Sequence, residues 1–559
     1  MPSTAPPSLR RRFHGLALCW ICKRVVSLSP SSMFILAVLS ALSCAATSTV
    51  VPAGSTGDAT WPYQTFKTVN FTPPYLQITH QIQPSEGYLF LAPDGATEFQ
   101  LGPLIMDMYG ELVWNGPNEH AFNFGAQKYR GQDVLVWWNG TLYPEPIGRG
   151  NGVVYMLNNR YEKIHEVTLV GDFLEQIPGA VFPSNVDLHE VYLTDNGTVL
   201  VTANNVTQRD LSSVGGPTDG WVVDSQMYAI DVATNQVLFS WKSLDHLDQL
   251  PFSASLYPLG SEGFTGENQT VAWAYFHINA LSPFEDAYLI SSRYMCSAMA
   301  IAPDGHLKWR VQGRDGGDFT LGNGTEFCYQ HDVRILPDHP GQPTSNITLH
   351  MHDNHNCPID NGSVPSSGKS LLVDLDRKTV TLKRQYINES SPIYSTALGS
   401  YQPLADGNVF IGHGWIPILE EYAHTGQILT TIQFGVAAKR PDGGYLSPLK
   451  PTLSYRAFKQ PWLGCPTAPP DITAERGAAG VTVYVSWNGA TEVEAWEVYG
   501  GNATQLACLA TVKKAGFETA VDIPLVDHVQ VRPIARKGRD GMPACAGAPV
   551  ASEMLAVGA

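Results

Sequence analysis

The sequence predicts an all-β protein, with a six-bladed β-propeller over residues 60–465 and a small β-sandwich over residues 471–559. Gly (51) and Pro (40) are abundant beside many Val, Thr, Tyr and Trp residues, a composition typical of short strands joined by turns. A unit of four short strands recurs through the middle of the chain, and four-stranded repeats of roughly fifty to ninety residues indicate a propeller. The Pro-rich stretch 466–470 is then a linker between the two domains.

One repeat shows the pattern clearly. Its strands are expected at 189–193, 199–204, 227–231 and 237–241, with a turn at Asp195-Asn196-Gly197. Later copies open near residues 277, 330 and 401, and an earlier one lies near 122–139. A partial copy near 88–114 lacks its first strand. The segment 455–458, from the other end of the repeats, could supply that strand and close the ring.

Beyond the linker, short strand-like runs alternate with turns. They lie near 481–487, 495–499 and 529–533, and about ninety residues of this kind fit a small β-sandwich. The pattern resembles a fibronectin type III module. We expect this domain to be structural or an accessory binding unit.

The N-terminus predicts export. Residues 33–42 are a short apolar core, small residues follow at 43–46, and the basic residues precede them, so residues 1–46 are expected to be a signal segment whose true start could be Met33. An uncleaved signal anchor is the alternative. No later run has the 18 or more apolar residues of a membrane span. Asn-x-Ser/Thr sequons are spread along the chain, which fits a secreted glycoprotein; they are at Asn70, Asn139, Asn196, Asn205, Asn268, Asn323, Asn346, Asn361, Asn388 and Asn502.

Charge and cysteine content exclude some functions. The formal net charge is −16, so the chain is a poor binder of nucleic acid, which needs Lys and Arg for phosphate contacts. Six cysteines follow the signal segment, and an even number in an exported chain favours disulfides over zinc. Connectivity cannot be deduced from spacing; we expect Cys328–Cys357 and Cys508–Cys545.

The repeat places several polar residues at one mouth of the propeller channel. The start of each first strand and the end of each second strand lie at the same end of an antiparallel hairpin. His189, His277 and His331 begin first strands. Second strands end at Asn204, Arg293, Asp353 and His413. All seven should therefore face the same mouth, although they are far apart in the sequence.

The His-rich segment 350–355 allows two interpretations. Three histidines and an Asp could hold a metal. Along a strand, however, His350 and His352 share a face while Asp353 points the other way. We therefore expect no metal site, and His352 or Asp353 lining the pocket. His413 would form a pocket wall, with Trp415 or Phe276 available to stack on an aromatic ring.

Several motifs, in order and in blade register, resemble the arylsulfotransferase family, in its exported and largely fungal branch. The stretch 276–281 (Phe-His-Ile-Asn-Ala-Leu) followed by 289–293 (Leu-Ile-Ser-Ser-Arg) is similar to the family's His-x-Asn strand and Ser-Ser-Arg strand end. Residues 330–332 (Gln-His-Asp) and 187–190 (Asp-Leu-His-Glu) resemble the histidine motifs of the neighbouring blades. The segments 102–104 (Gly-Pro-Leu) and 111–114 (Glu-Leu-Val-Trp) are also similar to segments of the family. The resemblance covers roughly residues 60–465.

The resemblance implies a reaction. The family moves a sulfuryl group from a phenolic sulfate ester to another phenol without a nucleotide donor, and needs no metal or other cofactor. By resemblance, His331 would be the nucleophile that forms a sulfohistidine, and Arg293 would hold the sulfuryl oxygens. His277 would stabilise developing charge, with Asn279 of the same motif in the substrate site. His189 would be the general acid and base.

Three other functions remain open from the sequence. A non-catalytic secreted propeller could bind a small aromatic or carbohydrate ligand at the same mouth, since site residues can persist after an activity is lost. An aryl sulfate hydrolase would use the same residues with water as acceptor. A quinoprotein-like oxidoreductase with a bound redox cofactor is the third.

Overall fold

The computed structural model describes residues 49–52, 61–95, 98–143, 148–174, 184–336, 345–355, 363–446, 452–537, 545 and 550–558. The described residues all lie in one compact unit, Ala46–Ala559. The expected signal segment and Cys357 lie outside the described residues. Within those residues the structure is all-β, with no α-helix, and no helix there is long and apolar enough to cross a membrane.

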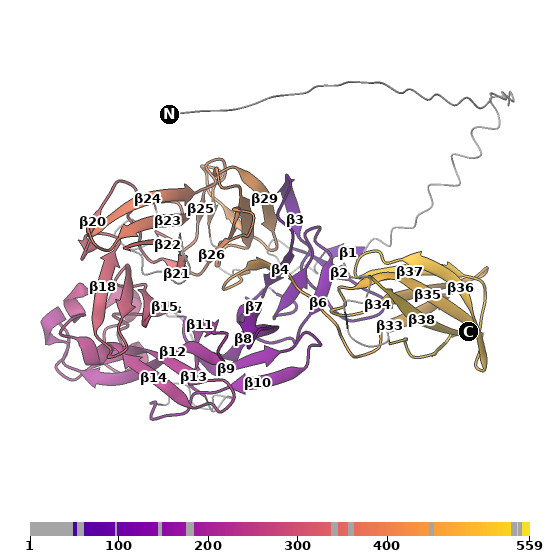
Figure 1. The fold of residues 1–559 in the computed structure, drawn as a ribbon, viewed down its shortest axis with the longest axis horizontal. Coiled ribbons are helices and arrows are strands. Elements are labelled where there is room, and N and C mark those ends of the chain that lie inside the picture. Colours follow the sequence, from indigo (N-terminus) through magenta and orange to yellow (C-terminus); the bar gives the residue numbers. More distant parts are fainter. Residues whose placement is uncertain are drawn as a thin grey trace, which may run out of the picture. The chain divides into compact units, whose positions relative to one another are not determined.

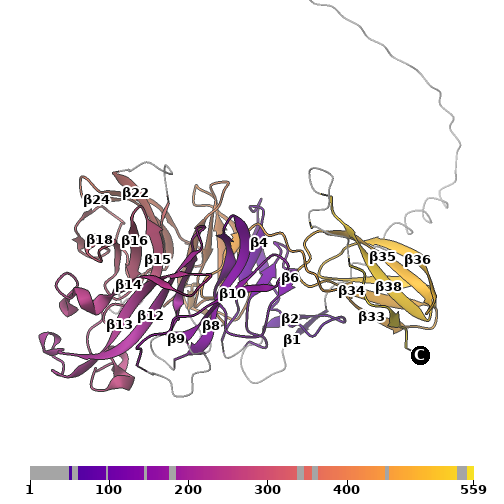
Figure 2. The ribbon, with the colours of Figure 1, turned by 60° about the horizontal axis from the view of Figure 1, so that its bottom comes forward.

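Six sheets of four or five strands follow one another around a ring (Figure 1). Three of them, in spatial order, are β32 (Phe458–Gln460), β4 (Tyr88–Leu91), β5 (Leu104–Met106) and β6 (Leu112–Asn115); β7 (Phe122–Tyr129), β8 (Gln132–Leu142), β9 (Gly150–Leu157) and β10 (Lys163–Val167); and β11 (Asp187–Leu193), β12 (Thr198–Arg209), β13 (Gly220–Asp231) and β14 (Val237–Lys242). Figure 2 shows β12 and β13 as a long two-stranded ribbon.

The other three sheets continue the ring. They are β15 (Ile278–Phe284), β16 (Ala287–Ser292), β17 (Ser297–Ile301), β18 (Leu307–Gln312) and β19 (Gly316–Gly317); β21 (His331–Leu336), β22 (Asn346–Asp353), β23 (Ser367–Asp374), β24 (Thr379–Tyr386) and β20 (Thr320–Leu321); and β26 (Ser400–Pro403), β27 (Val409–Gly412), β28 (Ile418–Tyr422), β29 (Ile428–Gln433) and β3 (Gln77–Gln81). Neighbouring strands are antiparallel except β20 and β24. The tight turns use glycines with positive φ, such as Gly197 (φ 93°) and Gly407 (φ 89°), as turn chemistry requires.

The ring closes through segments from both ends of the chain. β32 pairs antiparallel with β4, so that Phe458 lies opposite Phe90. This confirms that the segment near 455–458 completes the first sheet. β3 pairs with β29 and adds an outer strand to the last sheet, as the adjacent indigo and orange strands in Figure 1 show. The inner strands contact one another in the order β7, β11, β15, β21, β26 and β32, and β32 returns to β7.

Glutamine side chains join neighbouring inner strands. Gln127 in β7 bonds to the backbone of β11, donating to the Val191 carbonyl at 2.9 Å. Gln402 links β26 to β32 and Gln460 links β32 to β7 in the same way. Because inner strands of neighbouring sheets do not share a ladder, these amides satisfy backbone groups that would otherwise lack partners. Apolar side chains fill the space between the sheets.

The C-terminal region consists of two antiparallel sheets that share one apolar core. They are β33 (Asp471–Arg476), β34 (Val481–Ser486) and β37 (Glu518–Ile523), and β36 (Gln505–Lys513), β35 (Val493–Asn502), β38 (His528–Ala535) and β39 (Leu555–Ala556). Val483, Trp496 and Val529, from different strands of both sheets, belong to this core.

The remaining elements are small. They are β1 (Thr49–Pro52) and β2 (Pro62–Thr65); β25 (Ile393–Tyr394), β30 (Ala438–Lys439) and β31 (Tyr445–Leu446); and the 3₁₀ turns η1 (Ser212–Val214), η2 (Ser243–His246), η3 (Phe252–Ala254), η4 (Ser261–Gly263) and η5 (Gln269–Val271).

Both expected disulfide pairings are wrong. Cys328 pairs with Cys296, and Cys545 pairs with Cys465, while Cys508 is free and exposed. Cys508 lies on β36 and Cys465 lies just before the C-terminal sheets, so the second disulfide ties the segment preceding these sheets to the last part of the chain. Cys296 and Cys328 come together because the inner strands β15 and β21 are neighbours.

A buried ion network occupies the centre of the ring. The Arg456 guanidinium donates two hydrogen bonds to Glu190, at 2.7 Å and 3.1 Å, and lies beside Asp332. Arg334 contacts both carboxylates, at 2.7 Å and 3.0 Å. Burial alone would raise the pKa of Glu190, but the charges of Arg334 and Arg456 lower it. The network joins β11, β21 and the segment before β32, and Glu190 also accepts from the Leu281 N–H of β15.

Removing the central guanidinium should strongly destabilise the ring. In Arg456→Met two buried carboxylates lose one of their two arginine partners, so we expect the free energy of unfolding to fall by about 3–5 kcal/mol. Arg377→Met is a matched control, because Arg377 pairs with Asp374 at the surface and its side chain is 81% exposed; its cost should stay below about 1 kcal/mol. Urea unfolding of both variants measures the difference. Equal midpoints would show that the network contributes no stability.

Candidate functional site

The inner strands do not start regularly. β-Bulges interrupt the first residues of β7, β11, β15 and β21. Three residues here have left-handed backbone, namely Asn123 (φ 58°), His277 (φ 57°) and Asp332 (φ 52°). A bulge turns the side chains beside it and ends the regular ladder. The strand starts that carry the predicted histidines are therefore locally distorted in a way that sequence periodicity does not reveal.

The three predicted histidines gather at one end of the channel. The rings of His189 and His277 are 4.5 Å apart and nearly perpendicular. The Tyr455 ring lies next to both His189 and His331, with centroids at 5.9 Å and 6.4 Å. All three histidines are buried. Tyr455, just before the closing strand, therefore packs between the first and last of them.

Asp187 fixes the ring of His189. Its carboxylate contacts the His189 Nδ1 closely and also accepts from the Gly150 N–H at 3.0 Å and the Thr202 hydroxyl at 3.2 Å. Burial alone would raise the pKa of Asp187, but His189 and the hydrogen bond from the Gly150 N–H lower it. The ionised Asp187 leaves the Nε2 side of His189 for other contacts. This is the arrangement in which a carboxylate orients an imidazole for proton transfer.

His331 is buried and makes two hydrogen-bond contacts, one at each ring nitrogen. Its Nδ1 is 2.7 Å from the Asn354 Oδ1, and its Nε2 is 3.2 Å from the Leu398 backbone nitrogen. Burial and the nearby Arg293 hold the pKa of His331 well below its usual value. Burial, His189 and Arg293 do the same for His277. Both rings are therefore neutral at pH 7, which is the form of imidazole that acts as a nucleophile.

Arg293 is held by aromatic rings. Its guanidinium carbon is 4.0 Å from the Tyr329 ring centroid and 5.1 Å from that of Tyr294. Its Nη2 donates to the Thr396 carbonyl at 3.1 Å. Tyr294 also packs against His277, with ring centroids 4.9 Å apart. Arg293 thus supplies a cation close to both His277 and His331, as its effect on their pKa values shows.

The other predicted residues divide into two groups. Asn279 donates to the Gln330 carbonyl at 2.7 Å and so joins β15 to the strand of His331. Trp415 is partly buried and packs in the apolar cluster that contains Leu398 and Tyr455. Asn204 lies on β12 two residues beyond Thr202, which pairs with Asp187. These three residues lie at or near the histidine cluster.

Two expectations about ligand contacts are wrong. The Phe276 ring is fully buried in an apolar core against Trp241, so it cannot stack on a ligand. Asp353 does not line the cluster. It is buried and held by Lys369 at 2.8 Å, by His355 at 3.1 Å and by the Cys328 N–H at 3.1 Å. Asp353 thus anchors the Cys328 segment.

His352 and His413 bond to each other behind the cluster. The His352 Nε2 is 3.1 Å from the His413 Nδ1, and the His413 Nε2 is 3.1 Å from the Glu420 carboxylate. His350 stacks on Tyr401 instead. In the part of the chain that the structure describes, no group of three or more His, Cys, Asp or Glu side chains could hold a metal.

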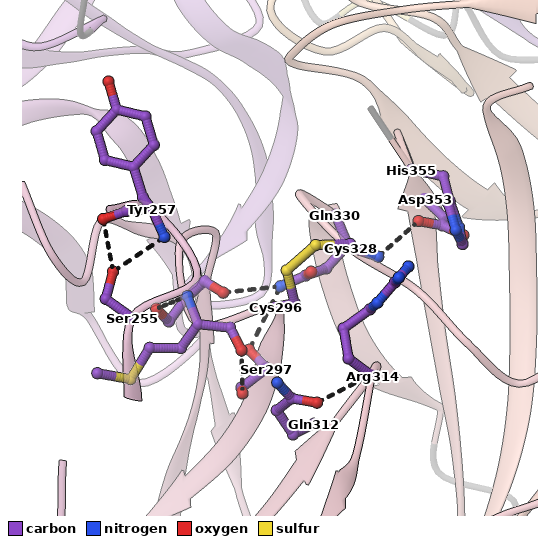
Figure 3. The surroundings of a disulfide bond; sticks show 12 residues. Ser255, Tyr257, Cys296, Ser297, Gln312, Arg314, Cys328, Gln330, Asp353 and His355 are labelled. Atoms are coloured by element: carbon purple, nitrogen blue, oxygen red, sulfur yellow. Dashed lines mark hydrogen bonds and ion pairs between the residues drawn. A yellow bond between two sulfur atoms is a disulfide. The ribbon is translucent and has the colours of Figure 1, made fainter. Parts of the chain in front are cut away.

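A disulfide connects the segments that carry Arg293 and His331 (Figure 3). Cys296 follows Arg293 by three residues and Cys328 precedes His331 by three. Figure 3 shows the Cys328 N–H aimed at Asp353, and both cysteines are fully buried. Gln330, next to His331, donates to the Ser291 hydroxyl and the Ser292 carbonyl of β16. The two segments are thus joined covalently and by hydrogen bonds.

A separate cavity of about 1100 Å³ opens on the far side of the central ion network. It is lined by the later residues of the inner strands, among them Tyr192, Arg334 and Gln402, and not by the three histidines. Glu190, Asp332 and Arg456 lie between the two regions of the channel, since they contact both the cavity and the backbone around His189.

Sequence reasoning missed three residues of the cluster. Asp187 was part of a motif but had no assigned role. Asn354 lies in the His-rich segment 350–355, in which the sequence points to the histidines and Asp353 as metal or pocket residues and not to the asparagine. Arg149, in the segment before β9, is buried, and its charge contributes to the lowered pKa of His277. A single Arg between Gly148 and Gly150 gives no local signal of such a position.

Buried neutral histidines should make the fold sensitive to acid. Burial lowers the pKa of His350 and His352 to about 3. As the pH falls below about 6.5, the unfolded chain binds protons that the folded chain does not, so stability is lost between about pH 6.5 and 3. By pH 5 each of these two histidines should lower the free energy of unfolding by about 2 kcal/mol.

The free energy of unfolding should fall between pH 7 and pH 5 in both proteins. In His350→Gln we expect this fall to be about 2 kcal/mol smaller than in the unsubstituted protein. His424→Gln, at an exposed position, is the control and should follow the unsubstituted protein. Urea unfolding at pH 7, 6 and 5 measures all three. An unchanged pH dependence in His350→Gln would contradict the assignment of His350 as a buried neutral ring.

Comparison with solved structures gives only distant likenesses. The chain is similar to an α-L-arabinofuranosidase from Fusarium graminearum (9% identity, 67% of this chain and 91% of that chain, TM-score 0.31) and to an α-L-arabinanase from Penicillium chrysogenum (10% identity, 72% and 94%, TM-score 0.30). It is also similar to a sucrose-6-phosphate hydrolase from Lactobacillus gasseri (10% identity, 80% and 88%, TM-score 0.28). No curated protein matches the chain.

The family comparison is specific. The sequence model described as arylsulfotransferase (ASST) matches residues 125–435. This range is more than half of the chain and contains His189, His277, Arg293 and His331. The chain therefore belongs to the arylsulfotransferase family.

Proposed function

We propose that this protein is an extracellular arylsulfotransferase that moves a sulfuryl group from an aryl sulfate ester to a phenol through a sulfohistidine at His331. The observation that carries the proposal is that three histidines at the starts of three inner strands meet Arg293, which follows β16, within the range of the family match. We further propose that the six sheets are the blades of a β-propeller and that residues 471–559 form a fibronectin type III-like sandwich. Two disulfides support export, because they are typical of oxidising compartments.

In the first half-reaction His331 attacks the sulfur of the donor. A nitrogen–sulfur bond forms, the bond between sulfur and the phenolic oxygen breaks, and the electron pair leaves on that oxygen. His189 gives the phenolate a proton, and Asp187 stabilises the charged imidazole before the transfer. Arg293 offers a planar set of donors to the sulfuryl oxygens.

In the second half-reaction the acceptor reverses these steps. His189 takes the phenol proton, the acceptor oxygen attacks sulfur, and the nitrogen–sulfur bond breaks, so that neutral His331 is restored. This is a ping-pong cycle. His277 would act through a neutral N–H and not as a cation, because burial and the neighbouring charges keep its pKa low.

A chromogenic aryl sulfate, with and without an added phenol, tests the function. A transferase releases coloured phenol faster when the acceptor is present. A hydrolase releases it at the same rate without acceptor, and a binding protein releases none; either result would contradict the proposal.

The nucleophile has its own test. His331→Ala should lower kcat by at least about 1000-fold, because the covalent route is lost. The exposed His306→Ala is a matched control and should keep full activity. Donor treatment of the unsubstituted protein should add a sulfuryl group, stable in alkali and lost in acid, to the peptide that contains His331. Full turnover by His331→Ala would overturn the assignment.

A further inference from the structure

Asn354 makes three hydrogen bonds at the centre of the cluster. Its Oδ1 is 2.7 Å from the His331 Nδ1. Its Nδ2 donates to the Ser395 carbonyl at 3.2 Å and to the Leu398 carbonyl at 3.0 Å. Both carbonyls accept only, so the amide nitrogen must face them and the amide oxygen must face His331. Asn354 is fully buried, so water offers it no alternative partner.

This orientation decides which ring nitrogen of His331 carries the proton. The Asn354 Oδ1 can only accept, so the Nδ1 of His331 must donate and hold the proton. A second contact leads independently to the same tautomer. The Leu398 backbone N–H points at the His331 Nε2 from 3.2 Å, and a donor there requires a lone pair on Nε2. The two contacts together leave one neutral form of the ring.

The partners of Asn354 are themselves fixed. The Ser395 hydroxyl donates to the His413 carbonyl at 2.7 Å, and the Ser395 backbone N–H donates to the Ser366 hydroxyl oxygen at 3.0 Å. Leu398 has a left-handed backbone (φ 64°), which is unusual for a branched residue. The next residue, Gly399, has φ 116° and lies so close to His352 that an added Cβ would be 2.6 Å from its ring. The segment 395–399 is therefore held tightly against Asn354 and His331.

We propose that Asn354 is a positioning residue that fixes His331 in the tautomer with the proton on Nδ1 and the reactive lone pair on Nε2. The inference rests on the proposed function, in which His331 attacks sulfur. The attacking atom is then Nε2, and the sulfuryl group must replace the Leu398 N–H at this lone pair. The new bond joins Nε2 to sulfur, and the Nδ1 proton stays shared with Asn354 throughout.

Two substitutions at position 354 should act in opposite directions on His331. Asn354→Asp places a carboxylate beside Nδ1 and favours the imidazolium. The acid limb of the pH profile of kcat/KM should therefore shift to higher pH by at least about one unit. Asn354→Ala removes the acceptor, so the charged form of the His331 ring loses a partner. The acid limb of the kcat/KM profile should then shift to lower pH. In Asn354→Ala kcat should also fall about 10- to 100-fold at nearly constant donor KM, as for other groups that orient a reactive histidine.

Other charged or titratable groups around His331 are unchanged in these variants. They are Arg293, His189, His277, His352 and Tyr455. Asn115→Asp is the matched control, since Asn115 is a buried asparagine that donates to the Gly116 carbonyl, far along the chain from the histidine cluster. Its pH profile should equal that of the unsubstituted protein. A purely structural role of Asn354 would lower stability without opposite shifts.

Deuterium exchange at the imidazole C2 carbon gives a readout that does not need turnover. Mass spectrometry of the peptide containing His331 follows its titration in each full-length variant. A higher pKa of His331 in Asn354→Asp together with a lower pKa in Asn354→Ala supports the proposal. An unchanged titration of His331 in both variants overturns it. If aryl sulfates are not turned over but the shifts are present, the proposed function fails while the control of the ring by Asn354 stands.

Discussion

The Arg456 guanidinium is the contact on which the ring depends. It lies on the segment that closes the first sheet, and it bonds to Glu190 of β11 and contacts Asp332 of β21. It also donates to the carbonyls of His189 and Asn279. Charges this deep are tolerated only when each has its partners. One side chain therefore joins three inner strands next to the backbone of His189.

The inner strands hold two kinds of chemistry on neighbouring residues. His189 is followed by Glu190, His331 by Asp332 and Tyr455 by Arg456. At the bulged starts of β11 and β21 neighbouring side chains point in different directions, so that the rings meet in the cluster and the charged groups meet in the ion network. The imidazole rings thus lie beside the ion network and are not part of it. Burial, with Arg293 close by, lowers the pKa values of His277 and His331, while the carboxylates of Glu190 and Asp332 are paired with arginines.

Features of the fold and the site that follow from a repeated local pattern could be predicted from the sequence, whereas contacts between distant segments could not. The closing segment and the grouping of His189, His277 and His331 follow from a repeated hairpin pattern, so they could be predicted. Contacts between blades leave no such pattern. The Cys296–Cys328 pair and the bond from Asn354 to His331 depend on how β15, β21 and β22 pack, and the burial of Phe276 depends on Trp241 from another sheet. Local sequence cannot specify these pairings.

Closure by β32 also has a consequence for synthesis. The strand that completes the first sheet lies about 370 residues after its partner β4, as their residue numbers show. A growing chain therefore exposes the edge of β4, and the carboxylates of Glu190 and Asp332, until almost the whole ring has left the ribosome. Long-range pairing of this kind is slow and leaves unpaired edges exposed. The chain should consequently depend on chaperones, or on early export, for longer than its individual sheets would.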